Sequence, residues 1–161
     1  MEKIKENRYL IVQGILLVLL LIYIGIIFSM KSGSNQDFSK VAKKLEKNLQ
    51  TEKLVKANAQ ELKRFYGLNV KDYEGGILYK TSSAIQVDEI LLLKAKSNEQ
   101  AEETLDLIQK RIDRQIKTFE GYGAEQTKLL KDAVLEARGK FVFFAVSSKA
   151  DELEKVFRES L

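Results

Sequence analysis

Arg111, Gln115 and Tyr122 form the one group of side chains in this sequence whose types and spacing suggest a binding surface. Arg111 and Gln115 are four residues apart, so they share one face if this segment is helical. Tyr122 follows just past the expected end of that helix, beside a glycine turn. Together they could hold an acidic group of a peptide or a glycan. The alternative is structural: Arg111 pairs with a neighbouring acid and Tyr122 packs on the sheet.

Asp88 and Glu89 are a second candidate, as paired carboxylates for acid–base catalysis. Adjacent residues of an extended segment point to opposite faces, which argues against a shared catalytic site. Helix capping or exposure to solvent is the interpretation that this pattern favours.

Residue types that the chain lacks exclude several chemistries. The sequence contains no cysteine and no histidine. Disulfides, thiolate nucleophiles and cysteine-type zinc sites are therefore excluded, as are imidazole bases, Ser-His-Asp triads and His-ligated metals. Catalysis would have to use Asp, Glu, Lys, Tyr or Ser, so the composition argues against an enzyme. We expect no catalytic residue, no cofactor and no metal.

The positive charge is concentrated in the first half of the chain. The net charge is +4. Residues 31–66 carry nine Lys and Arg against four acids, whereas residues 67–161 carry fifteen against seventeen. Anionic lipid headgroups beside the basic segment would explain this distribution. Nucleic acid is not an expected partner, because the basic segment lacks interleaved aromatics and any recognisable binding motif.

Leu10 to Phe28 is a run of 19 uncharged, mostly apolar residues. At 1.5 Å per residue a helix of this length spans roughly 28 Å, which matches a bilayer core. The predicted organisation is therefore a basic N-terminal tail (1–9), a transmembrane signal-anchor helix (10–28), a polar linker (29–36) and one globular domain (37–161).

A cleaved signal peptide is the competing interpretation of the apolar run. Its apolar region is usually shorter, and the residues that follow offer only a poor cleavage site at Ser32 and Ser34. Orientation is undecided by the residues, because Lys3, Lys5 and Arg8 precede the run while a larger number of lysines follow it.

Hydrophobic spacing and turn residues divide the domain into nine expected elements. Asp37 is expected to cap a first helix, and Asn58 with Glu61 to cap a second that ends at Gly67. Asn98 is expected to cap the longest helix. The remaining expected elements are strands at 77–80 and 87–96, a helix at 124–133, a hairpin of 134–137 with 140–147, and a terminal helix.

The expected fold class is α+β, in the order α-α-β-β-α-α-β-β-α, with a mainly antiparallel four-stranded sheet and segregated helices. The segments at 90–93 and 141–146 are apolar at consecutive positions, so both faces of these strands require cover. If helices cover only one face, the other is a surface for a partner.

Several fragments together resemble a family of uncharacterised small anchored domains or lipoproteins of Gram-positive, spore-forming bacteria. The fragments are RFYG at 64–67, DYEGG at 72–76, VDEILLLKAK at 87–96, Arg111-x-x-x-Gln115 followed by FEGYG, and GKFVFFAVS at 139–147. Many members are acylated at a cysteine that this chain lacks. The resemblance implies an extracytoplasmic domain and no known activity.

The leading hypothesis for function is a membrane-tethered extracytoplasmic binding or scaffold module that contacts another envelope component. Its partners would be membrane lipid, through the anchor helix, and a protein of unknown identity. One alternative is an envelope enzyme that uses Asp/Glu carboxylates, and another is a cytoplasmic regulator held at the inner leaflet.

Overall fold

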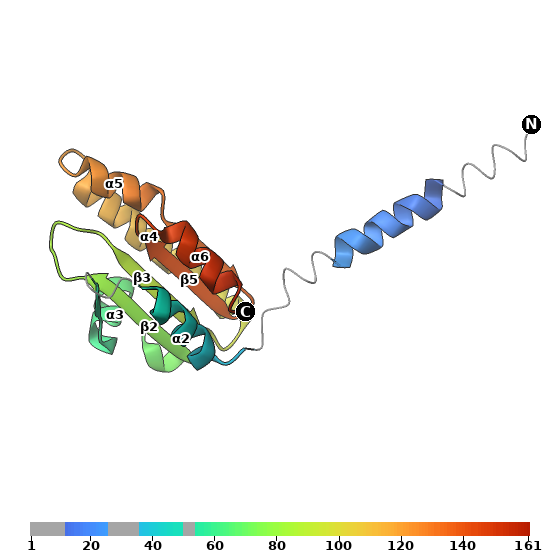
Figure 1. Cartoon of the computed structure of the whole chain (residues 1–161), viewed down its shortest axis with the longest axis horizontal. Coiled ribbons are helices and arrows are strands. Elements are labelled where there is room, and N and C mark those ends of the chain that lie inside the picture. Colours follow the sequence, from blue (N-terminus) through green and yellow to red (C-terminus); the bar gives the residue numbers. More distant parts are fainter. Residues whose placement is uncertain (1–11, 26–35, 50–53) are drawn as a thin grey trace, which may run out of the picture. The chain divides into compact units, whose positions relative to one another are not determined.

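The computed structural model describes residues 12–25, 36–49 and 54–161. The chain divides into two compact units, Met1–Ser32 and Gly33–Leu161. The second unit is an α+β domain built on one antiparallel sheet (Figure 1).

The sheet has five strands in the order β1-β2-β3-β5-β4. Their bounds are Leu54–Lys56 (β1), Gly75–Thr81 (β2), Glu89–Lys94 (β3), Val134–Arg138 (β4) and Phe141–Val146 (β5). The prediction of four strands missed β1, which pairs with the end of β2. Its three residues lie at an edge of the sheet, where partial solvation removes the apolar signal of a buried strand.

The two central strands are those whose sequences are apolar at consecutive positions. β3 pairs with both β2 and β5, and every residue of β5 is buried. Leu91, for example, lies between Leu78 and Phe144. This confirms the expectation of strands covered on both faces.

Helices cover both faces of the sheet, so the condition for a partner surface on an uncovered face is not met (Figure 1). We call the two sides the α4 face and the α2 face. The α4 face is packed by α3 (Ala59–Tyr66), α4 (Asn98–Phe119) and α5 (Ala124–Lys131), and the α2 face by α2 (Phe38–Asn48) and α6 (Ala150–Arg158). A short 3-10 helix, η1 (Val70–Asp72), follows α3.

Local signals place most helix ends correctly. Asp37 caps α2, and Asn58 with Glu61 forms a capping box at the start of α3. Gly67 ends α3 with φ of 74°, a left-handed conformation that glycine adopts without strain. One predicted cap is wrong: Ser97, and not Asn98, accepts the hydrogen bond from the Gln100 N–H at the start of α4.

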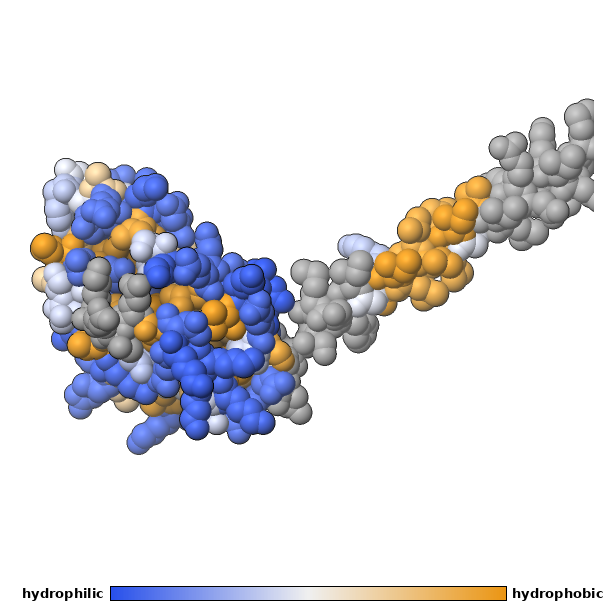
Figure 2. All heavy atoms as spheres, viewed as in Figure 1, coloured by the Kyte–Doolittle hydropathy of each residue, from blue (hydrophilic) through white to orange (hydrophobic). Residues whose placement is uncertain are grey.

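Residues 12–25 are helical with exposed, largely hydrophobic side chains (Figure 2). No helix within the described ranges combines the length and apolar character needed to cross a membrane. The predicted anchor at 10–28 therefore gains no support from the structure. Positions 10, 11 and 26–28 of that prediction lie outside the described residues.

Candidate functional site

A pocket of about 360 Å³ opens on the α4 face. It lies between the end of α3, the middle of α4 and the loop that joins β2 to β3. We call it the Arg64 pocket. Its walls combine cations, hydroxyls and amides with one aromatic ring. The lining residues are Arg64, Phe65, Lys80, Thr81, Ser82, Ser83, Ala84, Gln86, Val87, Asp88, Glu89, Arg111 and Gln115.

Glu89, Arg111 and Tyr66 form a buried polar cluster at the base of this pocket. Arg111 binds the Glu89 carboxylate through two nitrogens, with Nη2 2.7 Å from Oε2 and Nε 3.2 Å from Oε1. The Tyr66 hydroxyl donates to Glu89 Oε1 at 2.7 Å. Glu89 is only 2% exposed. A buried carboxylate held by a bidentate guanidinium and a phenol is already fully engaged.

Burial shapes the ionisation of this cluster. It raises the pKa of Tyr66 well above its usual value, and the nearby Glu89 charge raises that pKa further. Burial is the largest single effect on Arg111 and acts to lower its pKa, but the charge of Glu89 together with Tyr66 and the hydrogen bonds to both outweighs it, and the pKa is raised. Tyr66 therefore stays a neutral donor and Arg111 stays charged.

Phe65 is surrounded by cations at the rim of the pocket. The guanidinium carbons of Arg64 and Arg111 each lie 4.6 Å from its ring centre, and Lys80 Nζ lies 5.7 Å away. Arg114 also donates to the Phe65 carbonyl at 3.1 Å. Cation–π contacts of this kind hold the three charges close together despite their mutual repulsion.

The charges at the pocket differ in how far they are neutralised. Arg111 is paired with Glu89, and Lys80 lies 3.4 Å from Glu61. Among the described residues, no carboxylate lies within ion-pairing distance of Arg64. Arg64 is therefore the cation with the most capacity to bind an external anion.

Gln115 carries a polar atom that the domain leaves unsatisfied. Its side-chain Oε1 is buried and has no hydrogen-bond partner among the residues that the structure describes. A buried acceptor without a donor is costly, roughly 1–3 kcal/mol. Gln115 also lines the Arg64 pocket, so a turn of its amide toward the pocket would let Oε1 accept an N–H or O–H of a ligand there.

The loop between β2 and β3 has its own hydrogen bonds. Thr81 N–H donates to the Asp88 carbonyl at 2.8 Å, which closes the loop at its base. Thr81 Oγ1 bonds Gln86 at 3.2 Å and accepts from Ser83 N–H at 3.1 Å. These bonds hold the hydroxyl-rich wall in place opposite α4.

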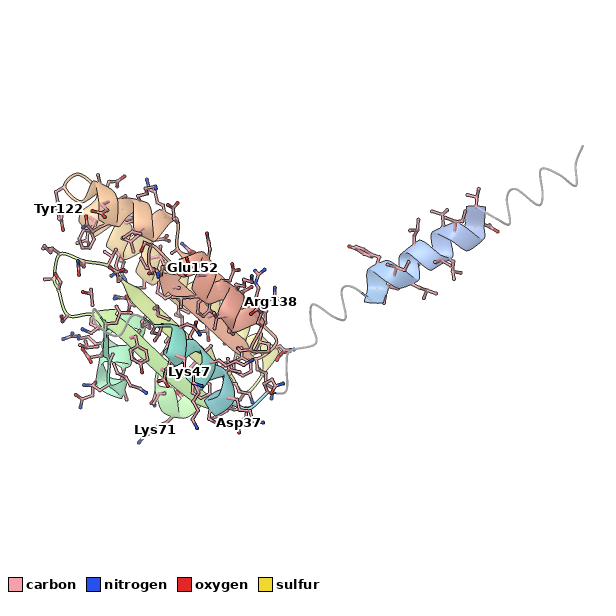
Figure 3. The ribbon with its side chains drawn as sticks, in the orientation of Figure 1. Asp37, Lys47, Lys71, Tyr122, Arg138 and Glu152 are labelled. Atoms are coloured by element: carbon pink, nitrogen blue, oxygen red, sulfur yellow. The ribbon has the colours of Figure 1, made fainter. Side chains whose placement is uncertain are left out.

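The structure brings two of the three predicted binding residues together. Arg111 and Gln115 line the same pocket, whereas Tyr122 is not among its lining residues. Tyr122 is 72% exposed at the turn between α4 and α5, where its ring tilts against Phe119 (Figure 3). The pairing of Arg111 with an acid was the structural alternative, and it is present. The packing of Tyr122 on the sheet is not.

The interpretation of Glu89 as exposed or capping is wrong, because Glu89 is buried in the ion pair. It starts β3 on the same side as Leu91 and Leu93, the side that faces α4. Every second residue of a strand points to the same face, so the position of Glu89 two residues before Leu91 could have predicted its burial. Arg64 and Lys80 were missed as pocket residues, since nothing in their local sequence indicates that α3 and β2 meet there.

The described residues contain no group of three or more Asp or Glu side chains that could hold a metal ion. Glu89 is also unsuited to acid–base work, because its oxygens already accept from Arg111 and Tyr66.

Residues 47–147 match a family described as a domain of unknown function, DUF4358. The match covers more than half of the chain and includes every residue that lines the Arg64 pocket. The chain belongs to this family. No curated protein and no solved structure matches it.

Proposed function

We propose that this protein is a membrane-tethered, extracytoplasmic binding module whose Arg64 pocket holds an acidic group of another envelope component. The observation that carries the proposal is that one pocket contains both an unpaired cation and an unsatisfied hydrogen-bond acceptor among the described residues. Within the described ranges, Arg64 has no carboxylate at ion-pairing distance and Gln115 Oε1 is a buried acceptor without a donor.

The pocket chemistry supports a ligand that bears both a carboxylate and an N–H group. Arg64, with Lys80 beside it, would take the carboxylate, since guanidinium groups bind carboxylates with two parallel hydrogen bonds. Gln115 Oε1 would accept the N–H. An acidic residue of a peptide carries both groups, as does a peptide linked to a glycan.

The role of Arg111 in this proposal differs from the one expected from the sequence. The Arg111 guanidinium is paired with the Glu89 carboxylate and stacks on the rings of Phe65 and Tyr66. In this proposal Arg111 therefore positions the pocket wall. The engaged carboxylate argues against the alternative of an envelope enzyme. The tether itself depends on the 19 uncharged residues Leu10 to Phe28 and on the family resemblance.

The pocket is tested with N-acetylglutamate, which carries carboxylates and an N–H. We expect titration of the full chain in detergent to shift the NMR signal of the Gln115 side-chain amide. Arg64→Gln should weaken the binding about tenfold or more, because it removes a charge-assisted hydrogen bond. Lys117→Gln, at an exposed site on α4, is the matched control. Equal binding by Arg64→Gln and the parent chain would contradict the proposal.

The partner and the orientation are tested in intact cells. A photo-crosslinking residue at Ser83, in the pocket wall, should yield a discrete adduct that Arg64→Gln abolishes. External protease should digest the domain in protoplasts without lysis. A domain that resists digestion until the cells are opened would instead favour the regulator held at the inner leaflet.

A further inference from the structure

Helix α2 presents four exposed lysines on a single face. Lys40, Lys43, Lys44 and Lys47 follow the spacing i, i+3, i+4, i+7. At 3.6 residues per turn they fall within an arc of about 100°. The buried residues Val41, Ala42 and Leu45 lie on the opposite side of the helix. We call the four residues the lysine stripe; Lys47 is labelled in Figure 3.

The lysine stripe has no carboxylate partner among the described residues, although Lys44 Nζ donates to the Glu159 carbonyl at 3.2 Å. The single acid within α2 is Glu46, and it is engaged elsewhere. Its Oε1 accepts from Lys56 at 3.1 Å and from the Tyr79 hydroxyl at 2.7 Å. Lys40 and Lys43 interact with Asp37 and Glu46 only from beyond ion-pairing distance, so most of the charge of the stripe faces solvent.

Helix stability does not explain this arrangement. Beyond the N-cap Asp37, the start of α2 contains no acid, and Lys40 lies beside the positive end of the helix dipole, where a cation is unfavourable. By contrast, α6 has Asp151 and Glu152 in its first turn and a salt bridge between Glu154 and Arg158. The two helices share one face of the sheet, yet α2 carries fewer acids at its N-terminal end.

We propose that the lysine stripe docks the domain on an anionic phospholipid surface. The inference rests on the proposed function for the tether, because the predicted linker of residues 29–36 would keep α2 within about 30 Å of the bilayer. Lysines near an anionic leaflet each strengthen association roughly fivefold, and salt screens the effect. Docking through α2 places the α4 face, with the Arg64 pocket, on the side of the sheet turned away from lipid.

A single cysteine tests this directly, because the chain has none of its own. Ser39→Cys, exposed beside the stripe, carries a polarity-sensitive fluorophore on the full chain in vesicles. Vesicles of phosphatidylcholine are compared with vesicles that also contain phosphatidylglycerol. We expect a blue shift and quenching by brominated lipid only in the anionic vesicles, with loss of the signal in 1 M NaCl. A fluorophore at Glu102→Cys on α4 should not respond.

Variants separate the stripe from net charge. Replacing Lys43 and Lys47 with Gln should weaken docking roughly 25-fold, measured as the ratio of docked to undocked domain at a fixed phosphatidylglycerol fraction. Lys110→Gln with Lys117→Gln removes two exposed charges from α4 and should have no effect. An equal loss in both double variants would overturn the inference, as would a Ser39 signal that is the same in both kinds of vesicle.

A separate extraction experiment distinguishes a wrong prediction of the membrane tether from a wrong inference about the lysine stripe. Alkaline carbonate should leave an anchored chain with the vesicles, whatever their charge. A chain that resists extraction but shows no response at Ser39 would reject the stripe and leave the tether intact. A chain that is extracted would reject the tether, and co-sedimentation with the two kinds of vesicle would then decide the stripe.

Discussion

The two faces of the sheet are packed by the same number of layers but by different chemistry. On the α2 face, Phe143 and Phe157 stack with ring centres 4.9 Å apart, and the fully buried side chains described there include no charged group. On the α4 face, the core contains the Glu89–Arg111–Tyr66 cluster and a hydrogen bond of 2.8 Å between the Tyr73 and Thr104 hydroxyls.

This difference separates stability from recognition. Truncating a side chain in an apolar core lowers the free energy of unfolding roughly in proportion to the volume removed. Removing one partner of a buried ion pair is strongly destabilising, because the other charge stays buried without a countercharge. The α4 face carries this cost beside the Arg64 pocket. The α2 face has its charges outside, on the lysine stripe. The α4 face, which would meet a ligand, thus has charged groups inside its core. The α2 face, which would meet lipid, has them on its outer surface.

The largest expected effect is the loss of the fold at high pH. The pKa of Tyr66 is raised above its unfolded value of about 10, so its contribution to stability is complete below pH 10 and is lost as the pH rises beyond it. Tyrosinate absorbance of the parent chain minus that of Tyr66→Phe reports Tyr66 apart from the other five tyrosines, without interference from tryptophan. We expect Tyr66 to ionise together with unfolding seen by circular dichroism. A titration of Tyr66 within the folded state would contradict this.

Arg111→Met should lower the free energy of unfolding by about 4 kcal/mol, because it leaves Glu89 buried without a countercharge. Urea unfolding of the full chain measures the change. The triple variant Tyr66→Phe, Glu89→Leu, Arg111→Met removes the whole polar cluster and should recover most of the loss. If the triple variant is no more stable than Arg111→Met, the cluster does not act through its charge.

Phe157→Ala should lower the free energy of unfolding by about 3 kcal/mol, since it leaves a cavity against Phe143 on the α2 face. Urea unfolding again provides the measurement. The loss should not depend on Arg111, so combining Phe157→Ala with Arg111→Met should give additive changes. Strong coupling between the two would show that the faces are not independent.

Asn58→Ala should cost about 1 kcal/mol, because it removes the bond that the Asn58 side chain accepts from Glu61 N–H in the capping box of α3 on the α4 face. Asp37→Ala, at the exposed cap of α2, removes the bond accepted from Ser39 N–H, which has no reciprocal side-chain bond, and should cost less. Thermal unfolding of the two variants compares the faces. A larger loss for Asp37→Ala would reverse the expected order.

The smallest effect concerns Glu46 on the α2 face. The hydrogen bond from Tyr79, together with Lys56, lowers the pKa of Glu46. Its contribution is therefore present above the unfolded pKa of about 4.5 and is lost as the pH falls through the lower folded pKa. For this half-exposed group we expect only a few tenths of a kcal/mol. Glu46→Gln should flatten the pH dependence of urea unfolding between pH 5 and 3.

Much of the fold was predictable because its signals are local. The spacing of Leu45, Ile108 and Ile112 marks helix faces, and the apolar runs of β3 and β5 require cover on both sides. β1 escaped because three partly exposed residues at a sheet edge carry little hydrophobic signal. Which helices cover which face could not be decided, since periodicity shows that a helix has an apolar side but not which layer it joins.

The candidate site divides in the same way. Arg111 and Gln115 were identifiable because one helical turn brings them together, and the four lysines of α2 follow from the same geometry. The sequence by itself also determined the missing chemistries, since absent residue types cannot be supplied by folding. Only the tertiary structure decided that Glu89 neutralises Arg111, and that Arg64 has no carboxylate within ion-pairing distance among the described residues. Those contacts join α3, β3 and α4 across long stretches of chain, and their distances depend on packing that no local pattern encodes.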